Sequence, residues 1–214
     1  MFCGVDEAGR GSVMGPMVVG AVYVEDENPL RSMGVKDSKK LTPRARDRLY
    51  DEITGSVPFW TFAAVSAEDI DIQRKTISLN EIELNMFADV ATQHGCARVV
   101  ADCPDINEVS FGDRLSNRIG PDVEIIAKHK ADDTYPVVSA ASIVAKVTRD
   151  RMLDDIRSEF DVNIGSGYPS DHYTMDFISE WIDRNGRAPE HVRCSWEPVR
   201  KMLSRRANTK ISDW

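Results

Sequence analysis

Acidic residues follow several short apolar runs of this sequence. Asp6 and Glu7 come after the first run, Asp102 ends a later one, and Asp132 comes after another. Functional sites of open α/β sheets form at strand ends, so such runs can bring four carboxylates to one edge. Oxygen ligands without Cys or His favour Mg²⁺ or Mn²⁺, and carboxylates clustered without a metal would repel one another. The pattern therefore suggests a site for Mg²⁺ or Mn²⁺, although solvated acids at strand ends would fit the spacing alone equally well.

The neighbouring acids Asp6 and Glu7 set a condition on the first strand. Successive side chains of a strand point to opposite faces of the sheet. Glu7 can therefore join Asp6 only if the strand breaks there. The glycines of the following segment, Gly9-Arg10-Gly11, would permit that break because glycine adopts conformations that other residues avoid.

The elements that must position these acids alternate along the chain. Apolar, β-branched runs predict strands, and helical periodicity with capping residues predicts helices. The predicted strands are residues 2–5, 15–24, 57–65, 98–101 and 123–127, and the predicted helices are residues 43–53, 79–94, 138–160, one helix around 177–182, and 196–203. This order predicts a mixed α/β sheet flanked by helices.

Composition restricts the class of protein. The chain has 214 residues, is 42% hydrophobic and carries a net charge of −8, which excludes coating of nucleic acid by bulk attraction. No apolar run approaches the ~18 residues of a membrane span, so no membrane association is expected. The four cysteines show no zinc-binding spacing and the N-terminus does not read as a signal peptide, so we expect reduced thiols and a cytoplasmic protein.

Four longer segments identify a family resemblance. They are GVDEAGRG at 4–11, DSKKL at 37–41, KADDTYPVVSAASIVAKVTRDR at 130–151, and GSGYPSD at 165–171. In their order and spacing they closely resemble type 2 ribonuclease H, also called ribonuclease HII, in its archaeal form. The resemblance extends from about residue 2 to residue 200.

The resemblance implies a fold, an activity and a set of acids. The family has a ribonuclease H-like fold and hydrolyses the RNA strand of RNA–DNA hybrids. It also cuts 5′ of ribonucleotides embedded in duplex DNA, leaving 3′-hydroxyl and 5′-phosphate ends. By motif, the catalytic and metal-binding acids fall on Asp6, Glu7, Asp102 and Asp132. Asp105 and Asp133 are the neighbouring rivals for the last two roles.

Substrate-binding residues follow from the same motifs. In the family, the Gly-Arg-Gly tripeptide contacts the ribonucleotide and the loop tyrosine stacks on the next sugar. Basic residues in 31–48, in 184–210 and on the long helix are expected to meet phosphates. The predicted substrate-binding residues are Gly9, Arg10, Gly11, Lys39, Lys40, Lys146, Arg149 and Tyr168. For a tyrosine in a Gly/Pro loop, simple loop packing is the plainer interpretation without the resemblance.

The last residues resemble a peptide that binds the sliding clamp, PCNA. Asn208, Ile211 and Trp214 match its spacing, with Asn in place of Gln and one terminal aromatic in place of two. A frayed tail with an incidental tryptophan is the alternative. By expected function the chain divides into a catalytic domain (1–164), a C-terminal helical substrate-binding lobe (165–207) and this tail (208–214).

We expect a monomeric type 2 enzyme that acts in DNA replication or ribonucleotide excision repair. Two other functions are alternatives to this interpretation. The first is a type 3 ribonuclease H, whose extra N-terminal domain would have no room before Asp6. The second is a non-catalytic nucleic-acid or clamp-binding module, against which the intact set of acids argues.

Overall fold

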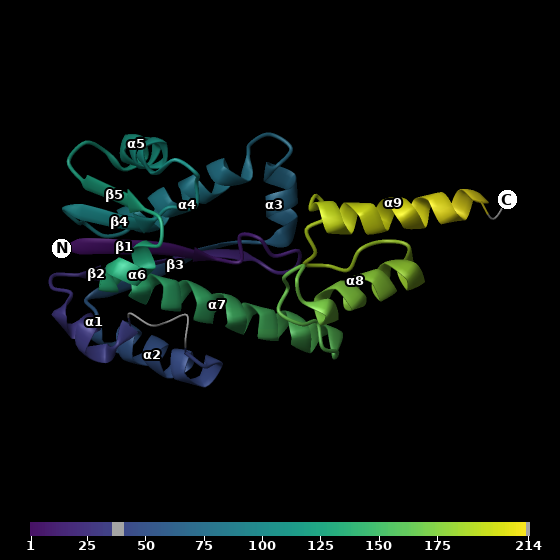
Figure 1. The fold of residues 1–214 in the computed structure, drawn as a ribbon, viewed down its shortest axis with the longest axis horizontal. Helices are drawn as coiled ribbons and strands as arrows, with labels where there is room; N and C mark the ends of the chain where they lie inside the picture. The colour runs from purple at the N-terminus through teal and green to yellow at the C-terminus, as the bar shows by residue number, and fades with distance from the viewer. Residues whose placement is uncertain (36–40, 213–214) are drawn as a thin grey trace. The chain divides into compact units, whose positions relative to one another are not determined.

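The strands form one mixed sheet whose central strand carries the first two acids (Figure 1). The structure is a computed structural model that describes residues 1–35 and 41–212, with the side chains of residues 1–35 and 41–207. The strands are β1 (Phe2–Ala8), β2 (Met17–Val24), β3 (Phe59–Val65), β4 (Arg98–Asp102) and β5 (Glu124–Lys128). Their order is β3-β2-β1-β4-β5; β1 runs antiparallel to β2 and parallel to β4, and β4 runs parallel to β5. The predicted mixed α/β fold is confirmed.

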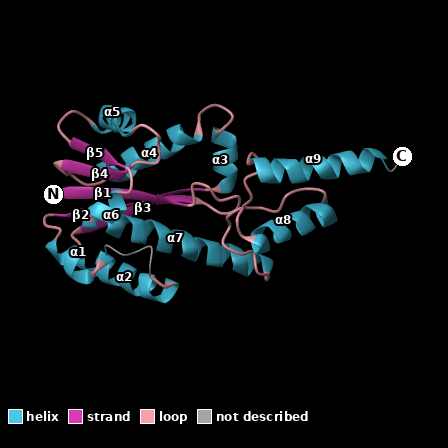
Figure 2. Ribbon diagram, in the orientation of Figure 1, coloured by secondary structure: helices cyan, strands magenta, loops and turns pink. Residues whose placement is uncertain are grey.

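Helices connect and cover the strands (Figure 2). They are α1 (Asn28–Met33), α2 (Pro43–Ser56), α3 (Ala67–Gln73), α4 (Leu79–Thr92), α5 (Glu108–Ile119), α6 (Ala131–Thr134), α7 (Pro136–Phe160), α8 (His172–Asn185) and α9 (Glu197–Ser212). The predicted start of α2 is correct, because the side chain of Thr42 accepts a hydrogen bond from the backbone N–H of Ala45 at 3.3 Å. Helices α1, α3, α5 and α6 have no counterpart among the predicted elements, and α9 continues to Ser212, beyond its predicted end at residue 203.

The two faces of β1 pack against different helices. Gly4 faces α7, where an added Cβ would lie 2.4 Å from the carbonyl carbon of Val137, so only glycine permits this approach. Cys3 is paired in register with Tyr23, whose hydroxyl donates to the carbonyl of Val90 in α4. Even-numbered residues of β1 therefore look toward α7 and odd-numbered residues toward α4.

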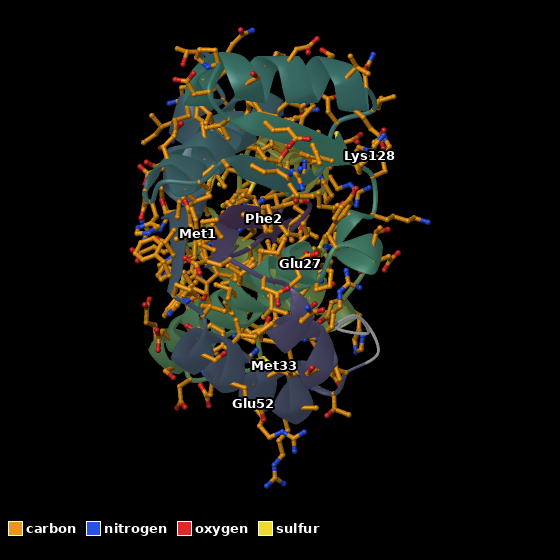
Figure 3. The ribbon with its side chains drawn as sticks, turned by 90° about the vertical axis from the view of Figure 1, so that its left-hand side faces the viewer. Met1, Phe2, Glu27, Met33, Glu52 and Lys128 are labelled. Atoms are coloured by element: carbon orange, nitrogen blue, oxygen red, sulfur yellow. The ribbon has the colours of Figure 1, made fainter. Side chains whose placement is uncertain are left out.

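The start of α7 is fixed by a side chain from the β2–α1 connection. Glu27, which Figure 3 labels between Phe2 and Met33, accepts a hydrogen bond at 3.1 Å from the backbone N–H of Val137. A carboxylate at this position satisfies one of the amide groups that a helix leaves open at its N-terminus. This contact helps to anchor the helix that carries residues next to the acids.

By contacts, the chain divides into two units that differ from the predicted division by function. The first comprises residues 1–8, 18–64 and 79–148, and the second comprises residues 9–17, 65–78 and 149–214. The second unit has its own core, which includes Val13, Leu153, Ile178 and Val199. The predicted lobe at 165–207 thus belongs to a larger unit, because segments far apart in sequence share its core. Among the described residues, no helix has the length and apolar character needed to cross a membrane.

Candidate active site

Asp6 and Glu7 lie just beyond the end of one strand ladder. β1 pairs with β4 only as far as Val5, opposite Ala101, while its pairing with β2 continues through Ala8. The predicted strand break at Glu7 is therefore wrong. The two acids instead occupy the stretch where β1 has left β4, which opens space beside Asp102 at the end of β4.

Asp6 is buried, with 4% of its surface exposed, and it faces the first half of α7. The hydroxyl of Ser142 donates to its carboxylate, and Lys146 in turn donates to that hydroxyl at 2.6 Å. Burial, followed by the negative charge of Asp102, raises the pKa of Asp6 to about 7, against the opposing effects of Ser142 and Lys146. A further positive charge nearby, such as a cation, would therefore stabilise the ionised form of this carboxyl.

Glu7 lies in the most acidic surroundings of the site. Burial raises the pKa of its carboxyl well above the ordinary value, and the charges of Asp6, Glu83 and Asp102 raise it further. Among the described residues, none donates a hydrogen bond to its buried Oε2 atom. Buried carboxylate oxygens are normally bonded, so this atom fits a ligand that supplies positive charge.

Asp102 and Asp132 are connected through the backbone. One carboxylate oxygen of Asp102 accepts a hydrogen bond from the N–H of Ala131 at 2.8 Å, which places the start of α6 beside the end of β4. Asp132 is the second residue of α6, and its side chain is 3% exposed. Its carbonyl accepts a hydrogen bond from the hydroxyl of Ser139. The hydrogen bond to Ala131 therefore brings Asp102 close to the segment that carries Asp132, although the two acids are far apart in sequence.

The rival acids occupy different surroundings. Asp105 accepts a hydrogen bond from Asn80 at 3.3 Å and forms an ion pair with Arg114 at 3.5 Å. Asp133, unlike Asp132, is exposed. The burial of Asp132 agrees with its preference over Asp133. Asp102 and Asp105 are both half-buried, and they differ in their partners, because Asp102 bonds the start of α6.

The donor set fits a divalent cation of the Mg²⁺ type. Asp6, Glu7, Asp102 and Asp132 offer only oxygen atoms, and Glu7 keeps a buried oxygen without a donor. No three of these four described acids have carboxylate oxygens that all lie within 4.8 Å of one another. A shared cation would draw these like charges together.

The predicted sugar-reading residues come together in the second unit. The backbone N–H of Gly9 donates to the hydroxyl of Tyr168 at 3.1 Å, which joins two motifs that are 159 residues apart. Gly9 has a φ of +82°, and a Cβ there would lie 2.2 Å from Nε of Arg149. Gly11, in contrast, has open space around the position of a Cβ. The loop is thus packed at Gly9 and open at Gly11.

The residues predicted to contact phosphates differ in where the structure places them. Lys146 lies beside Asp6, as described above. Arg149 is only 3% exposed and donates to the backbone carbonyls of Met14, Pro16 and Ser166, a placement that differs from the predicted phosphate contact. The other two predicted phosphate contacts, Lys39 and Lys40, lie outside the described part of the chain. The predicted clamp-binding residue Trp214 and the side chain of Ile211 also lie outside it.

Two buried charged residues near these sites were missed by sequence reasoning. Glu83 is 1% exposed and acts on Glu7. Its signal was a charge within the apolar stripe of its helix, four residues after Leu79 and three before Met86. Arg193 is fully buried in the second unit, and no local pattern of the sequence predicted its burial.

Comparisons with known proteins agree with these features. The family model described as Ribonuclease HII matches residues 3–199. The curated Ribonuclease HII of Methanospirillum hungatei is 40% identical over 100% of both chains, and that of Methanocorpusculum labreanum is 42% identical over 100% of this chain and 99% of its own.

Solved structures give the same result. The ribonuclease H2 of Pyrococcus horikoshii superimposes with a TM-score of 0.90 at 36% identity, covering 96% of this chain and 98% of its own. The ribonuclease HII of Archaeoglobus fulgidus, solved in complex with PCNA, gives a TM-score of 0.88 at 38% identity, covering 94% and 96%.

Proposed function

Because the chain belongs to the ribonuclease HII family and so has ribonuclease H activity, we propose that it is a metal-dependent endonuclease of RNA–DNA hybrids and of single ribonucleotides in duplex DNA. The observation that carries this proposal is the buried acid cluster beyond the β1–β4 ladder. Burial, followed by the charges of neighbouring acids, raises the pKa values of Asp6 and Glu7 there. A protein that merely bound nucleic acid would gain nothing from burying these charges.

The acids would hold two divalent cations, Mg²⁺ or Mn²⁺. Such ions supply an activated water at the scissile phosphate and stabilise the leaving 3′ oxygen. Asp6 and Asp132 are the least exposed of the four acids. Lys146 and Ser142 hold Asp6 from the α7 side, so its carboxylate is oriented before substrate arrives. The products would carry 3′-hydroxyl and 5′-phosphate ends.

The loop of Gly9, Arg10 and Gly11 would read the ribose, together with Tyr168. Only the 2′-hydroxyl distinguishes RNA from DNA at one nucleotide, and small residues let backbone groups approach it. The open space at Gly11 and the bond between Gly9 and Tyr168 support this assignment. Lys39 and Lys40 of the DSKKL motif are proposed to contact phosphates near the cut.

The deciding experiment is incision of a duplex that contains one ribonucleotide. We expect a single cut 5′ of the ribonucleotide with Mg²⁺ or Mn²⁺, and none with a chelator. An RNA–DNA hybrid should be cut at several positions and an all-DNA duplex not at all. Binding of the duplex without any metal-dependent cut would overturn the proposal in favour of a binding module.

The tail at 208–214 is proposed to bind a sliding clamp in a monomeric, cytoplasmic enzyme that acts in replication or ribonucleotide repair. The complex of the Archaeoglobus fulgidus protein with PCNA supports a partner of this kind. Helix α9 continues to Ser212, so most of the tail extends a helix of the second unit.

A further inference from the structure

Two buried arginines hold the segment that contains the Gly-Arg-Gly motif. Arg193 donates through Nη1 to the carbonyl of Arg10 at 2.9 Å, and through Nε and Nη2 to the carbonyl of Gly15 at 3.3 and 3.0 Å. Arg149 donates to the carbonyls of Met14 and Pro16 on the same segment. Side chains from two distant parts of the second unit thus fix the backbone of residues 10–16.

These arginines are unusual because they are buried and bond backbone carbonyls. Arg193 is 0% exposed and Arg149 is 3% exposed, and the hydrogen bonds described above all go from their guanidinium groups to carbonyl oxygens. The charges of Asp71 and Asp150 oppose the effect of burial on the pKa values of Arg193 and Arg149, respectively. Burial, followed by the charge of Arg149, lowers the pKa of Arg193 to about 9. A buried charge of this kind is costly, so backbone carbonyls must compensate for the lost water. The segment is consequently held by strong, charge-assisted hydrogen bonds.

The same network reaches the tyrosine of the predicted sugar-reading pair. The guanidinium carbon of Arg149 lies 4.8 Å from the centre of the Tyr168 ring, and that tyrosine bonds the N–H of Gly9. Gly167 adds its carbonyl, which accepts from the N–H of Val13 at 2.8 Å. Arg193 therefore holds the loop at the carbonyls of Arg10 and Gly15, and Tyr168 holds it at the N–H of Gly9.

We propose that Arg193 is a positioning residue that sets the selectivity for ribose by fixing the carbonyl of Arg10, without contacting the substrate itself. This inference rests on the proposed reading of the ribose by the Gly9–Gly11 loop. Selectivity for one hydroxyl group requires backbone atoms held to within a fraction of an ångström. A loop held only by the bond between Tyr168 and Gly9 would keep its average shape, but the position of the Arg10 carbonyl would vary more.

Arg193→Lys is the variant that separates positioning from charge. Lysine keeps the positive charge, but its single ammonium group cannot reproduce the planar fork that bonds two carbonyls at once. Arg74→Lys is the matched control. The guanidinium carbon of Arg74 lies 4.6 Å from the centre of the Trp196 ring, which that of Arg193 also approaches at 4.9 Å. Arg74, however, donates its hydrogen bond at 3.0 Å to the hydroxyl of Ser195 and not to the loop.

The experiment measures the dissociation constants of a single-ribonucleotide duplex and of the matching all-DNA duplex. Binding is followed in an Asp132→Asn background with Mg²⁺, so that the substrate stays intact. In Arg193→Lys, we expect weaker binding of the ribonucleotide duplex, by about tenfold, with little change for the all-DNA duplex. Arg74→Lys should leave the ratio of the two constants unchanged. Hydrogen exchange at residues 9–15 should be faster in Arg193→Lys alone.

Three results would overturn the inference. They are an unchanged ratio in Arg193→Lys, an equal loss of affinity for both duplexes, or the same loss of ratio in Arg74→Lys. A thermal melt of each variant establishes that it is folded. Failure of the proposed function is distinguishable, because the wild-type protein itself would then show no preference for the ribonucleotide duplex.

Discussion

The hydroxyl of Tyr168 accepts a hydrogen bond at 3.1 Å from the backbone N–H of Gly9, across 159 residues of sequence. This bond joins the two motifs to which the sequence assigned recognition of the sugar. It also separates two roles of the tyrosine, since the hydroxyl holds the loop while the ring remains the group that can stack on a sugar.

Substitutions of Tyr168 should resolve these two roles. Tyr168→Phe keeps the ring and leaves the Gly9 amide without its acceptor, which costs about 1 kcal/mol and predicts incision about fivefold slower. Tyr168→Ala also removes the ring and should be slower by at least a further tenfold, at about 1–3 kcal/mol for a stacking contact. Single-turnover incision of a single-ribonucleotide duplex measures both. Wild-type rates for Tyr168→Ala would contradict the substrate contact.

The glycines of the loop should respond differently to alanine. Gly11→Ala places a methyl group in open space, so the protein should melt within about 1 °C of wild type while losing incision at ribonucleotides. Gly9→Ala meets both the positive φ and the Nε of Arg149, so it should lower stability by about 1–3 kcal/mol. Thermal melts and incision rates are compared for the pair. Full activity in Gly11→Ala would show that the open space is not where the sugar binds.

The acid cluster predicts a pH dependence of stability in the metal-free protein. The pKa of Asp6 is raised to about 7, above a value of about 3.9 in the unfolded chain, so the folded state binds its proton more tightly. This contribution is fully present below pH ~4 and is lost as the pH rises through about 7. Mn²⁺ should restore stability most strongly above pH 7. Denaturant melts at several pH values, with Mn²⁺ or chelator, measure the effect.

Glu7→Gln is the variant that tests the origin of that dependence. Replacing the charge removes repulsion with Asp6, Glu83 and Asp102, so the metal-free variant should melt about 2–4 °C higher than wild type near pH 8. The same variant should lose incision and most of the stabilisation by Mn²⁺. A lower melting temperature without metal would contradict the repulsion that we assign to this carboxylate.

The thiols make a prediction that is independent of nucleic acid. A hydrogen bond from Cys3 lowers the pKa of Cys96 to about 7, whereas burial, followed by Asp71 and Glu68, raises the pKa of the exposed Cys194. Cys96 should therefore react with iodoacetamide first at pH 7, at about half its maximal rate. Cys3→Ala should return its midpoint toward an ordinary cysteine value. Peptide mass spectrometry reads both sites, and faster labelling of Cys194 at pH 7 would contradict the assignment.

Strand ends and helix periodicity were readable in the sequence because they depend on local patterns. Thr42 capped the helix that it was expected to cap, and Asp102 ended its strand as predicted. The relation of Asp6 to Glu7 was not readable, because it depends on where β1 parts from β4, and register between distant strands leaves no local trace. The burial of Arg149 and Arg193 was hidden for the same reason, since their partners are carbonyl groups, which every residue has.

The tail gives the last prediction, which separates binding of a partner from catalysis. If residues 208–214 bind the sliding clamp, their deletion should abolish binding of PCNA while incision of a free oligonucleotide duplex stays within about twofold of wild type. The reason is that the acids lie in the first unit, whereas the tail extends α9 of the second. Trp214→Ala is the finer variant, because large apolar side chains supply most of the energy at such anchors. Binding of the wild-type protein and of both variants to surface-immobilised clamp measures the effect. Undiminished binding by the deletion variant would disprove the role of the tail.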